Sequence, residues 1–155
     1  KVREIAPLSR TSKFNADVGD PESLRNGVDR PVGDIDNGWT APLGTPVTYT
    51  FDEAADISAV RIVFDSDLNR PSRNMRHVYL LDAKLWRPPE TLVKAFRIEA
   101  RTTEGGWDTV HHEDSNTQRL VRIPLKLSTT AIRLVCESTW GSDQAHLFAF
   151  EVGGG

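Results

Sequence analysis

The chain contains little cysteine and no long apolar run, and its charges are close to balanced. Cys136 is the one cysteine in 155 residues, so no internal disulfide can form. It lies in the strand-like stretch "AIRLVCES" and is predicted to be a small buried hydrophobic side chain. No apolar run approaches the roughly 20 residues of a membrane span, so no membrane partner is expected. The formal net charge is −3, with both signs interspersed. A nucleic-acid partner is not expected either, because such proteins carry a basic stripe.

The motifs that mark common enzyme sites are also missing. There is no glycine-rich phosphate loop, no dinucleotide fingerprint and no nucleophile elbow. His111 and His112 are neighbours, so on a regular strand they point to opposite faces and cannot share one metal ion. Asp65, Asp67 and Glu137 could supply the two carboxylates of a glycoside hydrolase, but solvated loop charges are the favoured interpretation. The sequence therefore predicts a domain without a catalytic site of its own.

The chain does contain many short β-rich runs separated by polar turns. Stretches such as "RIVF" and "RLVRI" alternate apolar with charged residues, which is the period of a half-buried strand. Eight such runs are expected, at Val47–Phe51, Ala59–Phe64, Val78–Leu81, Ala95–Ala100, Thr109–His111, Leu120–Leu125, Ala131–Cys136 and Leu147–Val152. They predict an all-β fold with little helix, in which about eight antiparallel strands form a two-sheet β-sandwich of jelly-roll type.

A chain of this length is expected to form a single domain. Residues 1–19 are predicted to be a lead-in segment that packs as an edge strand, and residues 20–152 the core of the sandwich. The chain begins at Lys1 and ends in three glycines, which is typical of a piece excised from a larger multidomain protein. No apolar leader is visible. An extracellular or periplasmic location is favoured if the domain binds a polysaccharide.

Function in a sandwich is expected in the loops at its ends. Residues 65–76, "DSDLNRPSRNMR", form a longer connection than two strands need, and the segment is very polar. Either it is simply a solvated loop or it builds one edge of a ligand site. Its candidate ligand-binding residues are Asp67, Asn69, Arg70, Arg73 and Asn74.

The four tryptophans suggest a class of ligand. A flat indole can cover the C–H face of a sugar ring, while arginine, asparagine and aspartate bind the hydroxyl groups around its edge. Trp39 and Trp107 are expected in the hydrophobic core. Trp86 is open to either interpretation. Trp140, which precedes the last predicted strand, is the strongest candidate for a sugar platform, although a core position remains open.

The segment "NGVDRPVGDIDNGW" places carboxylates among glycines, and oxygen-rich loops of this kind suit calcium. Asp29, Asp34 and Asp36 are the candidate metal ligands. Their spacing does not follow the EF-hand pattern. The sequence therefore suggests at most a structural calcium ion, with no catalytic role.

The order of these features resembles a known family. The loop "N..D....GW" is followed by "VTYTF", "ISAVRIVF", the hairpin "FRIEARTTEGGWDTV", "AIRLVC" and a closing "FAFEV". Over residues 20–152 this resembles the galactose-binding-like jelly-roll domains of the discoidin and coagulation-factor C type. More narrowly, "VFDSDLNR", "LVKAFRIEA", "NTQRLVRIPL" and "FAFEV" look like the C-terminal accessory domain of bacterial FAD-dependent oxidoreductases.

The galactose-binding-like resemblance implies a non-catalytic sandwich that binds glycans through loops at one end and often holds a structural calcium ion. The loop after "RIVF" and the loop before the last strand would form that end. The residues implied are Asp67, Asn69, Arg70, Arg73 and Trp140. One departure concerns the ion: many relatives carry a calcium-binding glutamate where this chain has Ala149.

Three hypotheses follow. In the first, the domain is a carbohydrate-binding module that holds a covalently attached catalytic domain on a glycan or polysaccharide. In the second, it is a structural or interaction domain of an FAD-dependent oxidoreductase that binds no sugar. In the third and weakest, it is a lyase or hydrolase with an acid–base pair in a cleft. The first is favoured.

Overall fold

The computed structural model of this chain describes residues 4–66 and 88–154. These residues form seven strands, one short α-helix and one 3-10 helix. The strands are β1 (Lys13–Ala16), β2 (Trp39–Pro42), β3 (Pro46–Phe64), β4 (Val93–Arg101), β5 (Trp107–Glu113), β6 (Leu120–Thr139) and β7 (Gln144–Gly154). The helices are α1 (Pro7–Thr11) and η1 (Pro21–Arg25).

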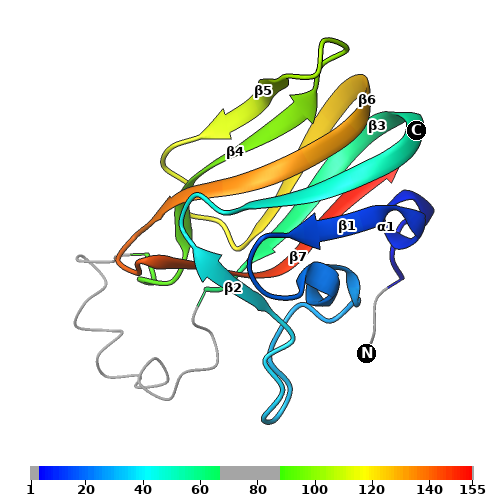
Figure 1. Cartoon of the computed structure of the whole chain (residues 1–155). Helices are drawn as coiled ribbons and strands as arrows, with labels where there is room; N and C mark the ends of the chain where they lie inside the picture. The colour runs from blue at the N-terminus through cyan, green and yellow to red at the C-terminus, as the bar shows by residue number, and fades with distance from the viewer. Residues whose placement is uncertain (1–3, 67–87, 155) are drawn as a thin grey trace, which may run out of the picture.

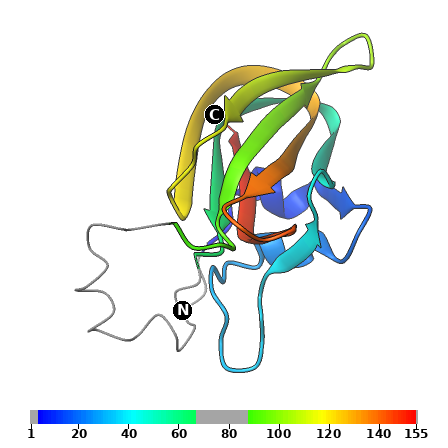
Figure 2. The same ribbon diagram turned by 90° about the vertical axis from the view of Figure 1, so that its left-hand side faces the viewer.

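All strand pairs are antiparallel, and two long strands run through both layers of the sandwich (Figures 1 and 2). Residues 46–50 of β3 pair with residues 131–135 of β6, and β4, β5 and β1 extend this first layer. Residues 55–63 of β3 pair with residues 120–129 of β6, and β7 and β2 extend this second layer. The register shifts in β3 between Thr50 and Ala55 and again between Ile57 and Ala59.

The predicted all-β sandwich is confirmed, but the boundaries of several strands were wrong. The runs Val47–Phe51 and Ala59–Phe64 belong to the single strand β3, and Leu120–Leu125 and Ala131–Cys136 both belong to β6. Register irregularities let a strand bend without a turn, so the polar residues between the runs stay in the sheet. The predicted strand Val78–Leu81 lies outside the described residues.

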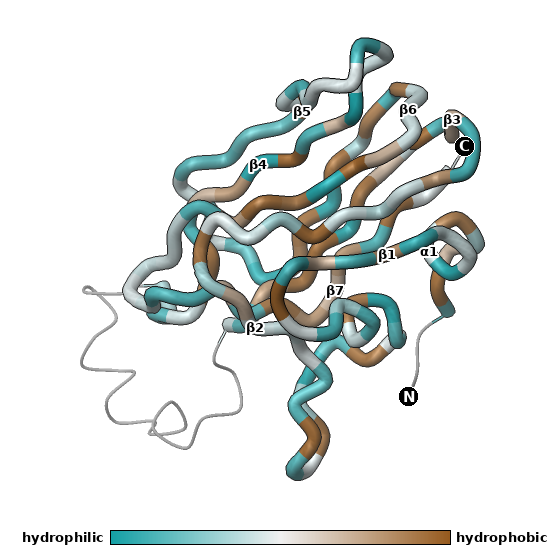
Figure 3. Tube along the Cα trace, viewed as in Figure 1, coloured by the Kyte–Doolittle hydropathy of each residue, from teal (hydrophilic) through white to brown (hydrophobic). Residues whose placement is uncertain are grey.

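The core between the layers follows the alternation of the sequence (Figure 3). In β3, Val47, Tyr49 and Phe51 are buried, and the residues between them are not. The Tyr49 hydroxyl donates a hydrogen bond of 2.6 Å to the carbonyl of Phe150, which satisfies its polar group inside the core. Cys136 is also buried there, and burial raises the pKa of its thiol to about 12. Its predicted role as a buried hydrophobic side chain is confirmed.

The lead-in segment is fastened to the sandwich. Its strand β1 pairs with β3 at the edge of the first layer, as expected, and the ring of Phe14 stacks on Tyr49 at 3.9 Å. The Ser9 hydroxyl donates to the Val152 carbonyl at 2.6 Å and accepts from the Val152 amide at 2.8 Å.

No helix among the described residues is long and apolar enough to cross a membrane.

The hairpin between β4 and β5 forms where the sequence predicts it. Arg101 pairs with Trp107, and the Thr102 amide donates to the Gly106 carbonyl across the turn. Gly105 has a φ of +91°, a conformation that L side chains rarely adopt. The hairpin therefore depends on glycine at this position.

Candidate functional site

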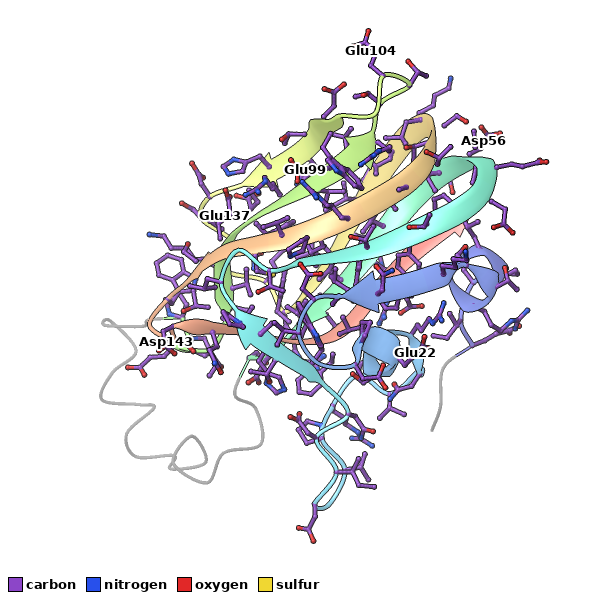
Figure 4. All side chains as sticks on the ribbon, viewed as in Figure 1. Glu22, Asp56, Glu99, Glu104, Glu137 and Asp143 are labelled. Carbon is purple, nitrogen blue, oxygen red and sulfur yellow. The ribbon has the colours of Figure 1, made fainter. Side chains whose placement is uncertain are left out.

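Several connections meet at one end of the sandwich. They are the β6–β7 loop, the segment leading into β4, the β5–β6 loop and the residues that follow β3. Asp143 of the β6–β7 loop marks this end in Figure 4, and Asp56 of β3 lies at the opposite end. The candidate site is built around Trp140, so this end is called the Trp140 end.

Trp140 is half-buried and held in a fixed position. Its backbone amide donates to the Leu92 carbonyl at 3.1 Å, and its indole Nε1 donates to the Asn116 carbonyl at 2.8 Å. Part of the side chain packs against the hydrophobic core. An indole fixed at both backbone and ring loses little conformational entropy when a ligand stacks on it.

One basic and one acidic side chain lie near Trp140 and its neighbour Gly141. The Lys94 ammonium lies 5.0 Å from the centroid of the Trp140 ring. The Glu90 side chain lies against Gly141, because a Cβ added to this glycine would be 2.8 Å from Glu90 Cγ. The Glu90 carbonyl also accepts from the Ser142 amide at 3.0 Å. An aromatic face beside a donor and an acceptor is the combination that a sugar ring requires.

The other tryptophans divide as follows. Trp39 is 3% exposed and its Nε1 donates to the Val18 carbonyl, so the predicted core position is confirmed. The core prediction for Trp107 was wrong. Its ring lies on the outer face of the first layer, with the guanidinium carbon of Arg133 at 4.1 Å and that of Arg101 at 5.1 Å. Two guanidinium groups therefore lie over the Trp107 ring, whereas a single lysine ammonium lies over the Trp140 ring.

The polar residues predicted in the loop after β3 cannot be placed. Asp67, Asn69, Arg70, Arg73 and Asn74 lie outside the described residues, as does Trp86, and their assignment stays a prediction. Among the predicted ligand-binding residues, Trp140 is therefore the one with a described position.

The three predicted metal ligands do not meet. Asp29 Oδ2 lies 2.8 Å from Arg61 Nη2, and Asp36 Oδ1 lies 2.8 Å from His146 Nε2. Asp34 is exposed on a turn closed by hydrogen bonds between the backbones of Val32 and Ile35. Within residues 4–66 and 88–154, no three His, Cys, Asp or Glu side chains are grouped so that they could hold a metal ion. The trio is thus not a shared ligand set, and calcium binding through other groups stays a prediction.

His146 is a contact residue that the sequence did not indicate. Its Nδ1 lies 2.9 Å from Asp65 Oδ2 and its Nε2 lies 2.8 Å from Asp36 Oδ1. Burial by itself lowers the pKa of His146, but the hydrogen bond to Asp65 and the charge of Asp36 outweigh burial and raise the pKa above 6.5. The partners are 81 and 110 residues away along the chain, so no local pattern could reveal them.

Comparisons with known proteins show the fold. No known family model matches the chain, and no curated protein matches it in sequence. Among solved structures, the family 32 carbohydrate-binding module of EndoD from Streptococcus pneumoniae has a TM-score of 0.70 at 10% identity. The match covers 96% of this chain and 99% of that one.

Two further matches were solved with sugars bound. Chitosan-binding module 2 of a Paenibacillus sp. IK-5 chitosanase/glucanase, in complex with chitotriose, has a TM-score of 0.65 at 12% identity and covers 95% of this chain and 99% of that chain. The family 32 module of NanJ from Clostridium perfringens, in complex with galactose, has a TM-score of 0.61 at 12% identity. The match covers 94% of this chain and 95% of that chain. The predicted galactose-binding-like jelly-roll fold is confirmed. The narrower resemblance to oxidoreductase accessory domains gains no support from these matches.

Proposed function

We propose that this domain is a carbohydrate-binding module with no catalytic site of its own, which holds an attached enzyme on a glycan. The observation that carries the proposal is the match along nearly the whole chain to several carbohydrate-binding modules. The sugars named for two of them, galactose and chitotriose, differ in size and charge. The fold therefore supports sugar binding as a class and leaves the individual sugar to the loops.

Trp140 is the centre of the proposed site. Its indole donates to the Asn116 carbonyl and its backbone amide donates to the Leu92 carbonyl. Lys94 lies over the indole and Glu90 lies against the adjacent Gly141, so these two side chains are the candidates to bind hydroxyl groups of a stacked sugar. The Lys94 side chain is long and half-exposed, so it can move aside to let the sugar stack. Affinity is expected to be modest, because a platform of one indole buries little area.

A titration of the isolated chain with a panel of soluble glycans tests the proposal. Calorimetry should detect binding to at least one glycan. Trp140→Ala should weaken that binding by about tenfold or more, because it removes the stacking surface. Trp140→Phe should retain most of the affinity, since it keeps an aromatic face while losing the hydrogen bond to Asn116.

Trp107→Ala is the matched control, because it removes an indole from the outer face of the first layer. It should leave glycan affinity unchanged. Equal affinity in Trp140→Ala and the parent chain would remove Trp140 from the site while leaving the module assignment intact. Absence of binding to every glycan, with a normal thermal unfolding transition, would reject the module in favour of a structural or interaction domain.

A further inference from the structure

We propose that arginine and histidine side chains, in place of a calcium ion, hold residues 26–38 against the second layer of the sandwich. These residues, called the 26–38 loop, contain the carboxylates whose pattern suggests a calcium site. The structure places Arg61 against Asp29 and His146 against Asp36. The proposal does not depend on the ligand of the Trp140 end.

Arg61 of β3 forms the first attachment. Its Nη2 lies 2.8 Å from Asp29 Oδ2 in the loop, and its Nη1 lies 3.1 Å from Glu151 Oε2 on β7. Only 19% of the Arg61 side chain and 6% of the Glu151 side chain are exposed. A guanidinium held between two carboxylates supplies the positive charge that a cation would otherwise bring to Asp29.

Arg119, just before β6, forms the second attachment. Its Nη2 donates a hydrogen bond to the backbone carbonyl of Asp29, and its guanidinium lies over the Phe148 ring at 5.9 Å. Burial lowers the pKa of this guanidinium, while the charges of Asp29 and Asp65 oppose that change. Backbone carbonyls are common calcium ligands, and here the carbonyl already accepts from an arginine.

The sheet beneath this arginine is apolar. Val63, Phe148 and Ala149 form a small buried cluster that is separate from the main core. Ala149 belongs to this cluster and contributes only a methyl group to it. A methyl group supplies no oxygen to a hard cation, and its apolar neighbours favour the stacked, weakly hydrated guanidinium of Arg119.

His146 of β7 forms the third attachment, near the other end of the loop. Its Nε2 contacts Asp36 at 2.8 Å, and its ring packs edge-on against Phe148 at 4.9 Å between centroids. A Cβ on Gly38 would lie 2.5 Å from the same nitrogen, so the backbone passes very close to the imidazole. The loop is therefore attached at Asp29 and at Asp36, on both sides of its exposed turn.

The first test asks whether calcium contributes to folding. Thermal unfolding of the whole chain is followed in calcium chloride and in EDTA at matched ionic strength, and calcium binding is measured by calorimetry. We expect the same unfolding midpoint in both solutions and no binding heat, because an ion that binds the native state must raise the midpoint. A midpoint several degrees higher in calcium, or a saturable binding heat, would overturn the proposal.

The second test removes the two arginines one at a time. Amide hydrogen exchange is measured by NMR at Val32 and Ile35, whose amides close the exposed turn of the loop, with the Gly105 amide of the β4–β5 turn as an internal reference. Arg61→Met and Arg119→Met should speed exchange at Val32 and Ile35 by about tenfold, with Gly105 unchanged. Arg119→Lys should recover part of the protection, since it keeps the charge.

Arg133→Met is the matched control, because it removes an arginine that contacts Glu99 on the opposite layer. It should leave exchange at Val32 and Ile35 unchanged. Unchanged exchange in Arg119→Met, or an equal increase in Arg133→Met, would show that the arginines do not hold the loop.

Discussion

The outer faces of the two layers carry similar residue types in different surroundings. On the first layer, ion pairs join Arg97 to Glu137 and Arg133 to Glu99 between β4 and β6, and Glu99 and Glu137 are visible there in Figure 4. On the second layer, ion pairs of Arg61 and His146 join strands to the 26–38 loop. The exposed fraction of the acidic side chain differs most between Glu137, at 32%, and Glu151, at 6%, whereas Glu99 on the first layer is 11% exposed and Asp36 in the loop is 58% exposed.

The comparison shows that the surroundings of an ion pair decide its role. Exposed pairs are solvated with or without their partners, so each contributes little to stability. A largely buried charge that loses its partner keeps the cost of leaving water, and its loss also releases the segment it holds. A count of charged residues in the sequence does not distinguish exposed ion pairs from buried ones.

Gly38→Ala should reduce stability the most, because its new side chain would collide with β7 of the second layer. The new Cβ would lie 2.5 Å from His146 Nε2 and 2.8 Å from the Leu147 carbonyl, so the loop or β7 must move. We expect a loss of about 2–3 kcal/mol in the free energy of unfolding, measured with urea. Gly106→Ala in the first-layer hairpin is the control, because its Cβ meets nothing nearer than Thr102 Oγ1 at 3.5 Å. Equal losses in both variants would contradict the comparison.

Glu151→Gln and Glu137→Gln compare one carboxylate from each face. Glu151→Gln leaves the largely buried Arg61 guanidinium with less compensating charge and should cost about 1–2 kcal/mol of stability. Glu137→Gln weakens exposed contacts to Arg97 and His112 and should cost less than about 0.5 kcal/mol. Urea unfolding of both variants at one pH measures the difference. A larger loss from Glu137→Gln would reverse our interpretation of the two faces.

The smallest of these effects is expected in the pH dependence of stability that His146 contributes. Because the folded-state pKa of His146 is raised above 6.5, its contribution is complete below about pH 6.5 and is lost as the pH rises through the folded-state value. Urea unfolding of the parent chain should therefore show a decline over that range. His146→Gln should reduce the decline. An identical pH profile in His146→Gln and the parent chain would show that the bridge between Asp36 and Asp65 adds no stability.

Some of this structure could be predicted from the sequence, because it depends on residues close together along the chain. The alternation in "VTYTF" and "FRIEA" predicts buried faces of β3 and β4, and "TEGG" predicts the hairpin that follows β4. The irregular pairing of β3 with β6 could not be predicted, since it requires the two strands to meet across the sandwich. For this reason two continuous strands were each divided into two.

The candidate site was predictable only in part. Trp140 was chosen as the sugar platform from its polar loop, and that role stays a prediction. The positions of Trp107 and Trp140 relative to the core could not be deduced, because each depends on strand register and on neighbours such as Arg133 and Asn116. Likewise the carboxylates of the 26–38 loop suggested a metal ion, because their partners Arg61 and His146 are distant in sequence.

The sequence by itself determined the all-β class, the hairpin, the buried cysteine and the location of polar loops, since these follow from periodicity and local turn chemistry. Only the tertiary structure decided which tryptophan is fixed at the loop end and which cations meet Asp29 and Asp36. Those contacts join residues from different strands and layers. Their formation depends on how the strands pair in three dimensions, which no short stretch of the chain encodes.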